Sequence, residues 1–159
     1  MKRLVIFGNS GSGKSTLSNQ LSETESLTHL DLDTLAWLPT TPPTRQLLTE
    51  SAKNIAEFIA SNDNWVIEGC YADLLELAIP AATEMIFMDL PVETCVENAR
   101  SRPWEPHKYE SKAAQDANLE MLVDWIKQYT SRDDTFSHAA HLALYESFSG
   151  QKSRRTENQ

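Results

Sequence analysis

Short apolar runs alternate with amphipathic stretches along this chain of 159 residues. The apolar runs have the length of buried strands, and a polar or glycine-rich segment follows each of them. The amphipathic stretches repeat apolar residues at helical spacing, as Leu48, Ala52 and Ile55 do. Strands that alternate with helices predict an α/β fold in three layers, with a parallel sheet between two layers of helices. The strands are predicted at 4–7, 27–31, 65–67 and 85–88, and the helices at 14–22, from 44, at 71–79, from 91, at 113–130 and at 135–148.

The pattern predicts a single domain over residues 1–150, interrupted by a break at 40–43 and a loop at 103–112. The last nine residues, 151–159, include no apolar residue and are expected to form a flexible tail. A further strand near the C-terminus is not evident, so the sheet is predicted to have four or five strands.

Charge and composition narrow the class of protein. The net charge is −9 and the isoelectric point is about 4.8, which argues against a general partner role for nucleic acid or an anionic membrane. Cys70 and Cys95 are too few for a disulfide framework. A signal-peptide core and an apolar run of bilayer length are both missing from the sequence, so a cytoplasmic protein is expected.

The nine residues from Gly8 to Thr16 match the pattern of a phosphate-binding loop, G-x-x-x-x-G-K-[ST]. The match lies between a predicted strand and a predicted helix, which is the context such loops require. Glycines allow positive φ and let the backbone N–H groups converge on an anion. Lys14 is predicted to contact the β- and γ-phosphates of ATP or GTP, and Ser15 to bind Mg²⁺. The predicted nucleotide-binding residues are Gly8, Asn9, Ser10, Gly11, Ser12, Gly13, Lys14, Ser15 and Thr16.

Two aspartates, Asp31 and Asp33, end the second predicted strand. If the strand continues through them, both side chains point to the same face. Ligands of open α/β sheets bind beyond the carboxyl ends of the strands, so the pair is expected near the phosphates. One carboxylate then orders water around Mg²⁺ while the other accepts a proton from a substrate hydroxyl. The alternative is a solvated turn in which an aspartate caps a helix.

The phosphate loop followed by these aspartates resembles shikimate kinase. The resemblance implies that Asp31 serves the metal and that Asp33 binds the acceptor hydroxyl and acts as the base. It also implies an arginine for the substrate carboxylate, for which Arg45 is the nearest candidate. The triple-glycine motif of that family is replaced here by Glu68-Gly69-Cys70-Tyr71, which argues against shikimate itself as the substrate.

The same segment also resembles the D-G pair of adenylate kinases, with Glu68 in place of the aspartate. This resemblance implies that Glu68 holds Mg²⁺ waters, and Glu68 is preferred to Asp89 for that role. The nucleotide-kinase resemblance extends to a lid at 103–112, whose arginines contact ATP phosphates. Arg102 is the expected lid arginine, and Arg100 is a substitute for an earlier one.

Two longer segments, 32–39 and 65–71, resemble small bacterial P-loop proteins described as topology-modulation-like or AAA-type ATPases. This similarity covers nearly the whole chain, but it does not imply a substrate. Trp37 and Tyr71 are either walls of an acceptor pocket, together with Gly69, or aromatic residues of the core and its rim.

These observations predict an ATP- and Mg²⁺-dependent kinase that phosphorylates a small hydroxylated metabolite, nucleoside or nucleotide. Lys14, Asp33 and Arg102 are the predicted catalytic residues. The alternative function is a regulatory nucleotide-binding protein with slow ATPase activity and a protein partner.

Overall fold

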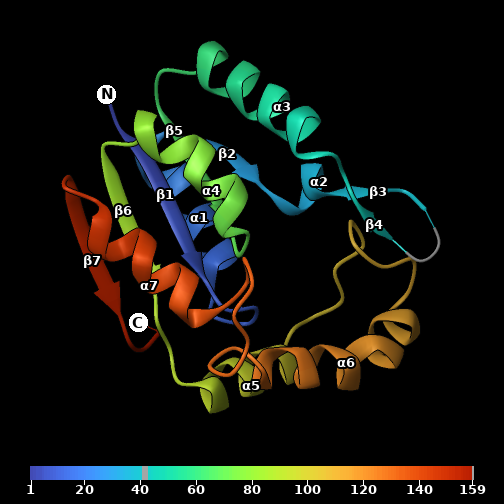
Figure 1. The fold of residues 1–159 in the computed structure, drawn as a ribbon. Helices are drawn as coiled ribbons and strands as arrows, with labels where there is room; N and C mark the ends of the chain where they lie inside the picture. Colours follow the sequence, from blue (N-terminus) through green and yellow to red (C-terminus); the bar gives the residue numbers. More distant parts are fainter. Residues whose placement is uncertain (41–42, 159) are drawn as a thin grey trace.

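The computed structural model describes residues 1–40 and 43–158, so part of the break predicted at 40–43 lies outside the described residues. Five strands form one parallel sheet in the order β2-β5-β1-β6-β7 (Figure 1). The central strand β1 aligns Val5 with Ile67 of β5 and with Met85 of β6. The predicted α/β fold with a parallel sheet is therefore confirmed. The strands are β1 (Arg3–Gly8), β2 (Thr28–Asp31), β5 (Trp65–Gly69), β6 (Glu84–Met88) and β7 (Gln151–Arg155).

Side chains alternate along each strand and so create two separate apolar layers. Val5 and Phe7 of β1 join a buried cluster with residues of the helices α3, α4 and α7. Leu4 and Ile6 of the same strand join a second buried cluster with residues of α1, α5 and α6. Helices thus cover both faces of the sheet (Figure 1). The helices are α1 (Lys14–Glu25), α2 (Asp33–Ala36), α3 (Leu48–Ser61), α4 (Ala72–Ala78), α5 (Val92–Arg100), α6 (Lys112–Lys127) and α7 (His138–Ser147), with a short 3₁₀ turn at Ile79–Ala81.

The expectation of a flexible tail at 151–159 is wrong for residues 151–155, which form the edge strand β7. β7 pairs with β6 in parallel, with Phe87 opposite Arg154. Arg154 Nε donates to the Asp89 carboxylate at 2.7 Å, and the Lys152 ammonium lies 4.7 Å from the ring centre of Tyr145. An edge strand with polar side chains is stable here because those side chains find partners directly after β6 and on α7.

A helix from Thr44 is also wrong, because the chain first forms a hairpin. Strands β3 (Trp37–Leu38) and β4 (Thr44–Arg45) pair in antiparallel fashion, and α3 begins only at Leu48. The hairpin extends from the β2 edge of the sheet beside α2 (Figure 1). None of the helices in the described part of the chain combines the length and apolar character that a bilayer crossing requires.

His141 of α7 is fully buried, at 0% exposure, and it links the helix to the chain after β5. Its Nε2 lies 2.8 Å from the carbonyl oxygen of Cys70, and its Nδ1 lies 2.7 Å from the hydroxyl of Tyr129. A carbonyl only accepts hydrogen bonds, so Nε2 carries the proton and Nδ1 accepts from Tyr129. Burial lowers the pKa of His141 to about 4, more than the Cys70 carbonyl raises it, so the imidazole stays neutral in the fold.

The free energy of unfolding should therefore fall as the pH drops from about 6.5 toward 4. In that window the unfolded chain binds a proton at His141 and the native protein does not. Between pH 7.5 and pH 5 this effect amounts to roughly 2 kcal/mol. Urea unfolding of the wild type and His141→Gln at both pH values measures it by difference. Parallel pH dependence in the two proteins would contradict the burial of a neutral imidazole.

Candidate functional site

The loop from β1 to α1 needs glycine at two positions for its shape. Gly11 and Gly13 have φ angles of 78° and 88°, which other residues rarely adopt. A Cβ atom at Gly11 would lie 2.4 Å from the carbonyl oxygen of Cys95, so α5 approaches the loop too closely for any side chain. Gly13 caps the N-terminus of α1 in the left-handed conformation. This end of the helix is a favourable place for a phosphate, because its N–H groups and dipole face outward.

Side chains from distant elements hold the loop from outside. Asn9 is buried, and its amide donates to the carbonyl of Ile126 on α6 at 3.2 Å. Asn98 of α5 donates to the carbonyl of Gly11 at 2.8 Å, and Asn158 donates to the carbonyl of Ser12 at 3.1 Å. The carbonyl oxygens at 11 and 12 are thereby bonded to neighbouring elements.

The remaining predicted loop residues differ in their surroundings. Lys14 Nζ donates to the carbonyl of Asn9 at 2.8 Å, so its ammonium folds back over the loop. Gly8 is buried at the end of β1 and Ser10 is half-buried, whereas Thr16 is exposed on the first turn of α1. The nine predicted residues are thus brought together as one loop.

Glu68 lies at the end of β5 and is only 2% exposed. Its Oε1 accepts the hydroxyl of Ser15 at 2.8 Å, and its Oε2 lies 2.8 Å from Nε2 of His29. Asp89, the rival carboxylate, instead pairs with Arg154 and lies 3.0 Å from His138 Nε2. Glu68 therefore bonds directly to Ser15 after the phosphate loop, whereas Asp89 is bonded to Arg154 and His138.

The two aspartates at the end of β2 lie in different electrostatic surroundings. Asp31 Oδ1 accepts the N–H of Asp33 at 2.9 Å, so Asp31 caps the turn into α2. Burial raises the pKa of Asp31, and the neighbouring charges of Asp33 and Glu68 raise it further. Burial also opposes ionisation of Asp33, but Lys108 and the hydroxyl of Tyr71 lower its pKa by more. Asp33 is therefore ionised at neutral pH.

The predicted acceptor residues form a chain of contacts from Asp33 outward. The hydroxyl of Tyr71 donates to Asp33 Oδ1, and Trp37 Nε1 donates to the hydroxyl oxygen of Tyr71 at 2.8 Å. Tyr71 is buried, whereas Trp37 is 41% exposed at the rim. Arg45 lies on β4, 5.1 Å from the ring centre of Tyr71, and its Nη2 donates to Asp73 at 3.1 Å.

Gly69 has a packing role in this structure. A Cβ atom at this position would lie 2.9 Å from the side chain of Leu32. The missing side chain allows the turn between β2 and α2 to pack closely on β5, and this turn carries Asp31 and Asp33.

The two predicted lid arginines each pair with a carboxylate in this structure, and their contact with ATP phosphates stays a prediction. Arg100 pairs with Glu120 of α6 at 2.7 Å on the surface, and Arg102 pairs with Glu105 at 3.2 Å. Arg100 faces α6 from the last turn of α5, and Arg102 follows the end of that helix. Arg100 is therefore bound to a carboxylate of α6, and Arg102 to a carboxylate of the lid.

Sequence reasoning missed Lys108, the lid residue that does reach the aspartates. Lys108 Nζ lies 3.1 Å from Asp33 Oδ2 and 4.0 Å from Asp31 Oδ2. Burial lowers its pKa, but the carboxylates of Asp33, Asp31 and Glu105 raise it by more, so the ammonium is charged. The local sequence around Lys108 carries no motif that distinguishes it. His29 was missed as well, although its position two residues before Asp31 on the same strand face was a usable signal.

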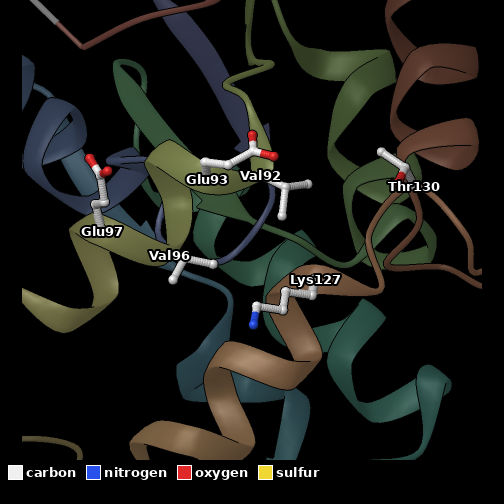
Figure 2. A pocket seen from close by; sticks show the side chains of 6 residues that line it. All are labelled: Val92, Glu93, Val96, Glu97, Lys127 and Thr130. Carbon is white, nitrogen blue, oxygen red and sulfur yellow. The ribbon is translucent and has the colours of Figure 1, made fainter.

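An open groove between α5 and α6 lies apart from these residues and encloses about 710 Å³. Figure 2 shows Val96 and Lys127 on opposite sides of it. The groove contains none of the predicted site residues, so it is not part of the candidate site. Its lining residues are Val92, Glu93, Val96, Glu97, Lys127 and Thr130.

Within residues 1–40 and 43–158, no three His, Cys, Asp or Glu side chains are arranged so that they alone hold a metal ion. Ser15 and Glu68 nevertheless offer hydroxyl and carboxylate oxygens, the ligands that Mg²⁺ prefers. Asp31 lies opposite Glu68 in the pairing of β2 with β5. These three residues fit a Mg²⁺ ion that takes its other ligands from water and phosphates.

Known proteins resemble this chain in sequence or in fold. The Bacillus subtilis (strain 168) protein YqaC, which is uncharacterized, is 25% identical over 147 residues, or 91% of this chain and 80% of that protein. A sugar kinase from Janibacter sp. HTCC2649 has a TM-score of 0.50 at 16% identity, covering 97% of this chain and 85% of that one. Shikimate kinase from Aquifex aeolicus vf5 has a TM-score of 0.47 at 18% identity, covering 79% of this chain and 92% of that one.

The sugar kinase comparison establishes likeness of fold alone. A family model described as an AAA domain matches residues 4–120, which include the phosphate loop, both aspartates and Glu68. The chain belongs to this AAA domain family.

Proposed function

We propose that the protein is an ATP-dependent kinase that phosphorylates a hydroxyl group of a small metabolite, nucleoside or nucleotide. The observation that carries the proposal is the contact of Asp33 with Tyr71 at the edge where Glu68 meets Ser15. A charged carboxylate backed by aromatic residues beside a phosphate loop suits the binding of an acceptor hydroxyl. A site that only binds a nucleotide does not need this additional carboxylate.

The loop end of the site suits Mg·ATP. Lys14 and the N-terminus of α1 supply positive charge for the phosphates. Ser15, Glu68 and Asp31 would hold Mg²⁺ and its waters, and that ion, when bound, neutralises charge on the β- and γ-phosphates. Burial raises the pKa of Asp31, and the neighbouring charges of Asp33 and Glu68, which a divalent cation would offset, raise it further.

The acceptor end suits proton transfer to Asp33. Tyr71 holds Oδ1 of Asp33, and this bond orients Oδ2 for an acceptor hydroxyl. In the transfer, Asp33 takes the hydroxyl proton while the acceptor oxygen forms a bond to the γ-phosphorus. The bond from that phosphorus to the bridging oxygen breaks, and ADP leaves with the electron pair. Trp37 and Arg45 then flank the acceptor, and closure of residues 103–112 excludes water.

One observation supports a second candidate function. Trp37, Leu47 and Leu48 are large exposed apolar side chains around the β3–β4 hairpin, at 41%, 68% and 49% exposure. Such a group suits a protein partner. The alternative is therefore a regulatory nucleotide-binding protein with slow ATPase activity.

Lys14→Ala should remove the rise in melting temperature that Mg·ADP gives the wild type. At a ligand concentration of about 100 times Kd, binding stabilises the fold by about 2.7 kcal/mol, which raises the melting temperature by roughly 5–11 °C. Differential scanning fluorimetry measures the shift. Lys53→Ala, on an exposed position of α3, is the matched control and should keep it. An equal shift in Lys14→Ala would refute the role of Lys14.

Asp33→Asn should lower acceptor-stimulated ADP release by on the order of 10²–10⁴-fold, the usual worth of a positioned base. Asparagine keeps the shape, and its carbonyl oxygen can still accept the hydroxyl of Tyr71, but its amide group cannot accept the proton. Its shift with Mg·ADP should stay near that of the wild type, whereas Asp31→Asn should weaken the Mg²⁺-dependent part of nucleotide binding. The assay screens hydroxylated metabolites, nucleosides and nucleotides.

Two outcomes decide between the functions. Full acceptor-stimulated turnover in Asp33→Asn would remove Asp33 as the base. A wild type that no member of the panel stimulates would favour the regulatory protein.

A further inference from the structure

Lys108 occupies the place that the acceptor needs. Its ammonium lies 3.1 Å from Asp33 Oδ2, while the hydroxyl of Tyr71 holds the other oxygen, Oδ1. Both oxygens of Asp33 are thus bonded to the protein's own side chains. An acceptor hydroxyl that takes the position of the ammonium on Oδ2 therefore displaces Lys108.

The turn that carries Lys108 is ordered and tied to α6. The N–H groups of Lys108 and Tyr109 both donate to the carbonyl of Glu105 at 3.0 Å. Gln115 of α6 accepts the N–H of Glu105 at 2.8 Å and donates to the carbonyl of Pro103 at 3.0 Å. These bonds brace the lid backbone on α6, so Lys108 can change partner by swinging its flexible side chain.

The other basic side chains of the lid region are bound to local carboxylates. Arg102 pairs with Glu105, Arg100 pairs with Glu120, and Lys112 pairs with Asp116 at 3.3 Å. Lys108 alone of these four residues contacts the aspartates of the candidate site. It faces Asp33 from the lid, while Lys14, on the phosphate loop, also lowers the pKa of Asp33.

We propose that Lys108 is the catalytic cation of the lid. While the acceptor site is empty, its ammonium pairs with Asp33. When an acceptor hydroxyl takes its place on Oδ2, the ammonium moves to the oxygens of the phosphoryl group in transfer. The inference rests on the proposed kinase function and assigns to Lys108 the part that the sequence predicted for Arg102.

Charge is the physical reason for this exchange of partners. The transferring phosphoryl group carries negative charge over three oxygens, and a positioned cation lowers the barrier. The ammonium has three donors on a flexible stem, so it can exchange one carboxylate for several phosphoryl oxygens. The transferring phosphoryl group, or a mimic of it, thus competes with Asp33 for the ammonium of Lys108.

The test compares ADP binding, in the presence of Mg²⁺, with and without aluminium fluoride, which mimics the phosphoryl group in transfer. In the wild type the fluoride complex should bind more tightly than ADP alone. Lys108→Met should lose this gain by roughly 10- to 100-fold while its affinity for ADP alone stays the same. Lys108→Arg should keep most of the gain, and Lys112→Met, which removes a basic residue at the start of α6, is the matched control.

A second measurement tests the pairing with Asp33. Hydrogen exchange of residues 104–110 in the ligand-free protein should rise in Lys108→Met, because the ion pair to Asp33 is lost. Unchanged tightening by aluminium fluoride in Lys108→Met would overturn the proposal and leave Lys108 as a tether of the lid.

Acceptor-stimulated turnover separates this proposal from the proposed function. If turnover in Lys108→Met equals that of the wild type, the kinase function stands and the role of Lys108 is wrong. If no acceptor stimulates the wild type but the gain with aluminium fluoride still requires Lys108, the kinase function fails. Lys108 is then the cation for transfer of the phosphoryl group to water.

Discussion

The hydrogen bond from Ser15 to Glu68 joins the two parts of the molecule on which the candidate site depends. Ser15 lies in the first turn of α1, which follows the phosphate loop, and Glu68 lies near the end of strand β5. A carboxylate that is 98% buried needs polar partners, and the hydroxyl of Ser15 and the ring of His29 supply them. The bond therefore ties the position of the loop to the register of the sheet. Because β2 pairs with β5, the same register brings Asp31 opposite Glu68.

Lysine side chains offset the negative charge of the carboxylates at this edge of the sheet. Asp31, Asp33 and Glu68 bring three carboxylates together. Burial raises the pKa of Asp31, and repulsion by the other two carboxylates raises it further. Lys108 and Lys14 oppose this charge at Asp33 and lower its pKa. Both are flexible side chains, on the lid and on the loop, whereas the carboxylates lie on or beside strands. In our account, ligands replace these contacts between lysines and carboxylates. Mg²⁺ binds the carboxylates, and the nucleotide phosphates bind the lysines.

Much of this arrangement could be predicted because it depends on local sequence. The phosphate loop needs glycines and a following helix, and the buried strands at 4–7, 65–67 and 85–88 need consecutive apolar residues. β7 could not be predicted in this way, because its side chains are polar and it is stable only through pairing with β6 and contacts to Asp89 and Tyr145. Lys108 was missed for a related reason. Its partners lie about 75 residues away, and only the folded lid brings them together. Arg102 has the more suggestive sequence, but a nearby carboxylate, Glu105, holds it.

Isothermal titration calorimetry with ADP at increasing Mg²⁺ concentration is the most direct test of the central claim. This claim is that Glu68 organises the site for a metal-bound nucleotide. In the wild type, Mg²⁺ should tighten ADP binding. In Glu68→Gln, which keeps the size and the hydrogen bond to Ser15, that tightening should disappear while the affinity for ADP without metal is retained. If Mg²⁺ tightens ADP binding in Glu68→Gln as much as in the wild type, the central role of Glu68 is wrong.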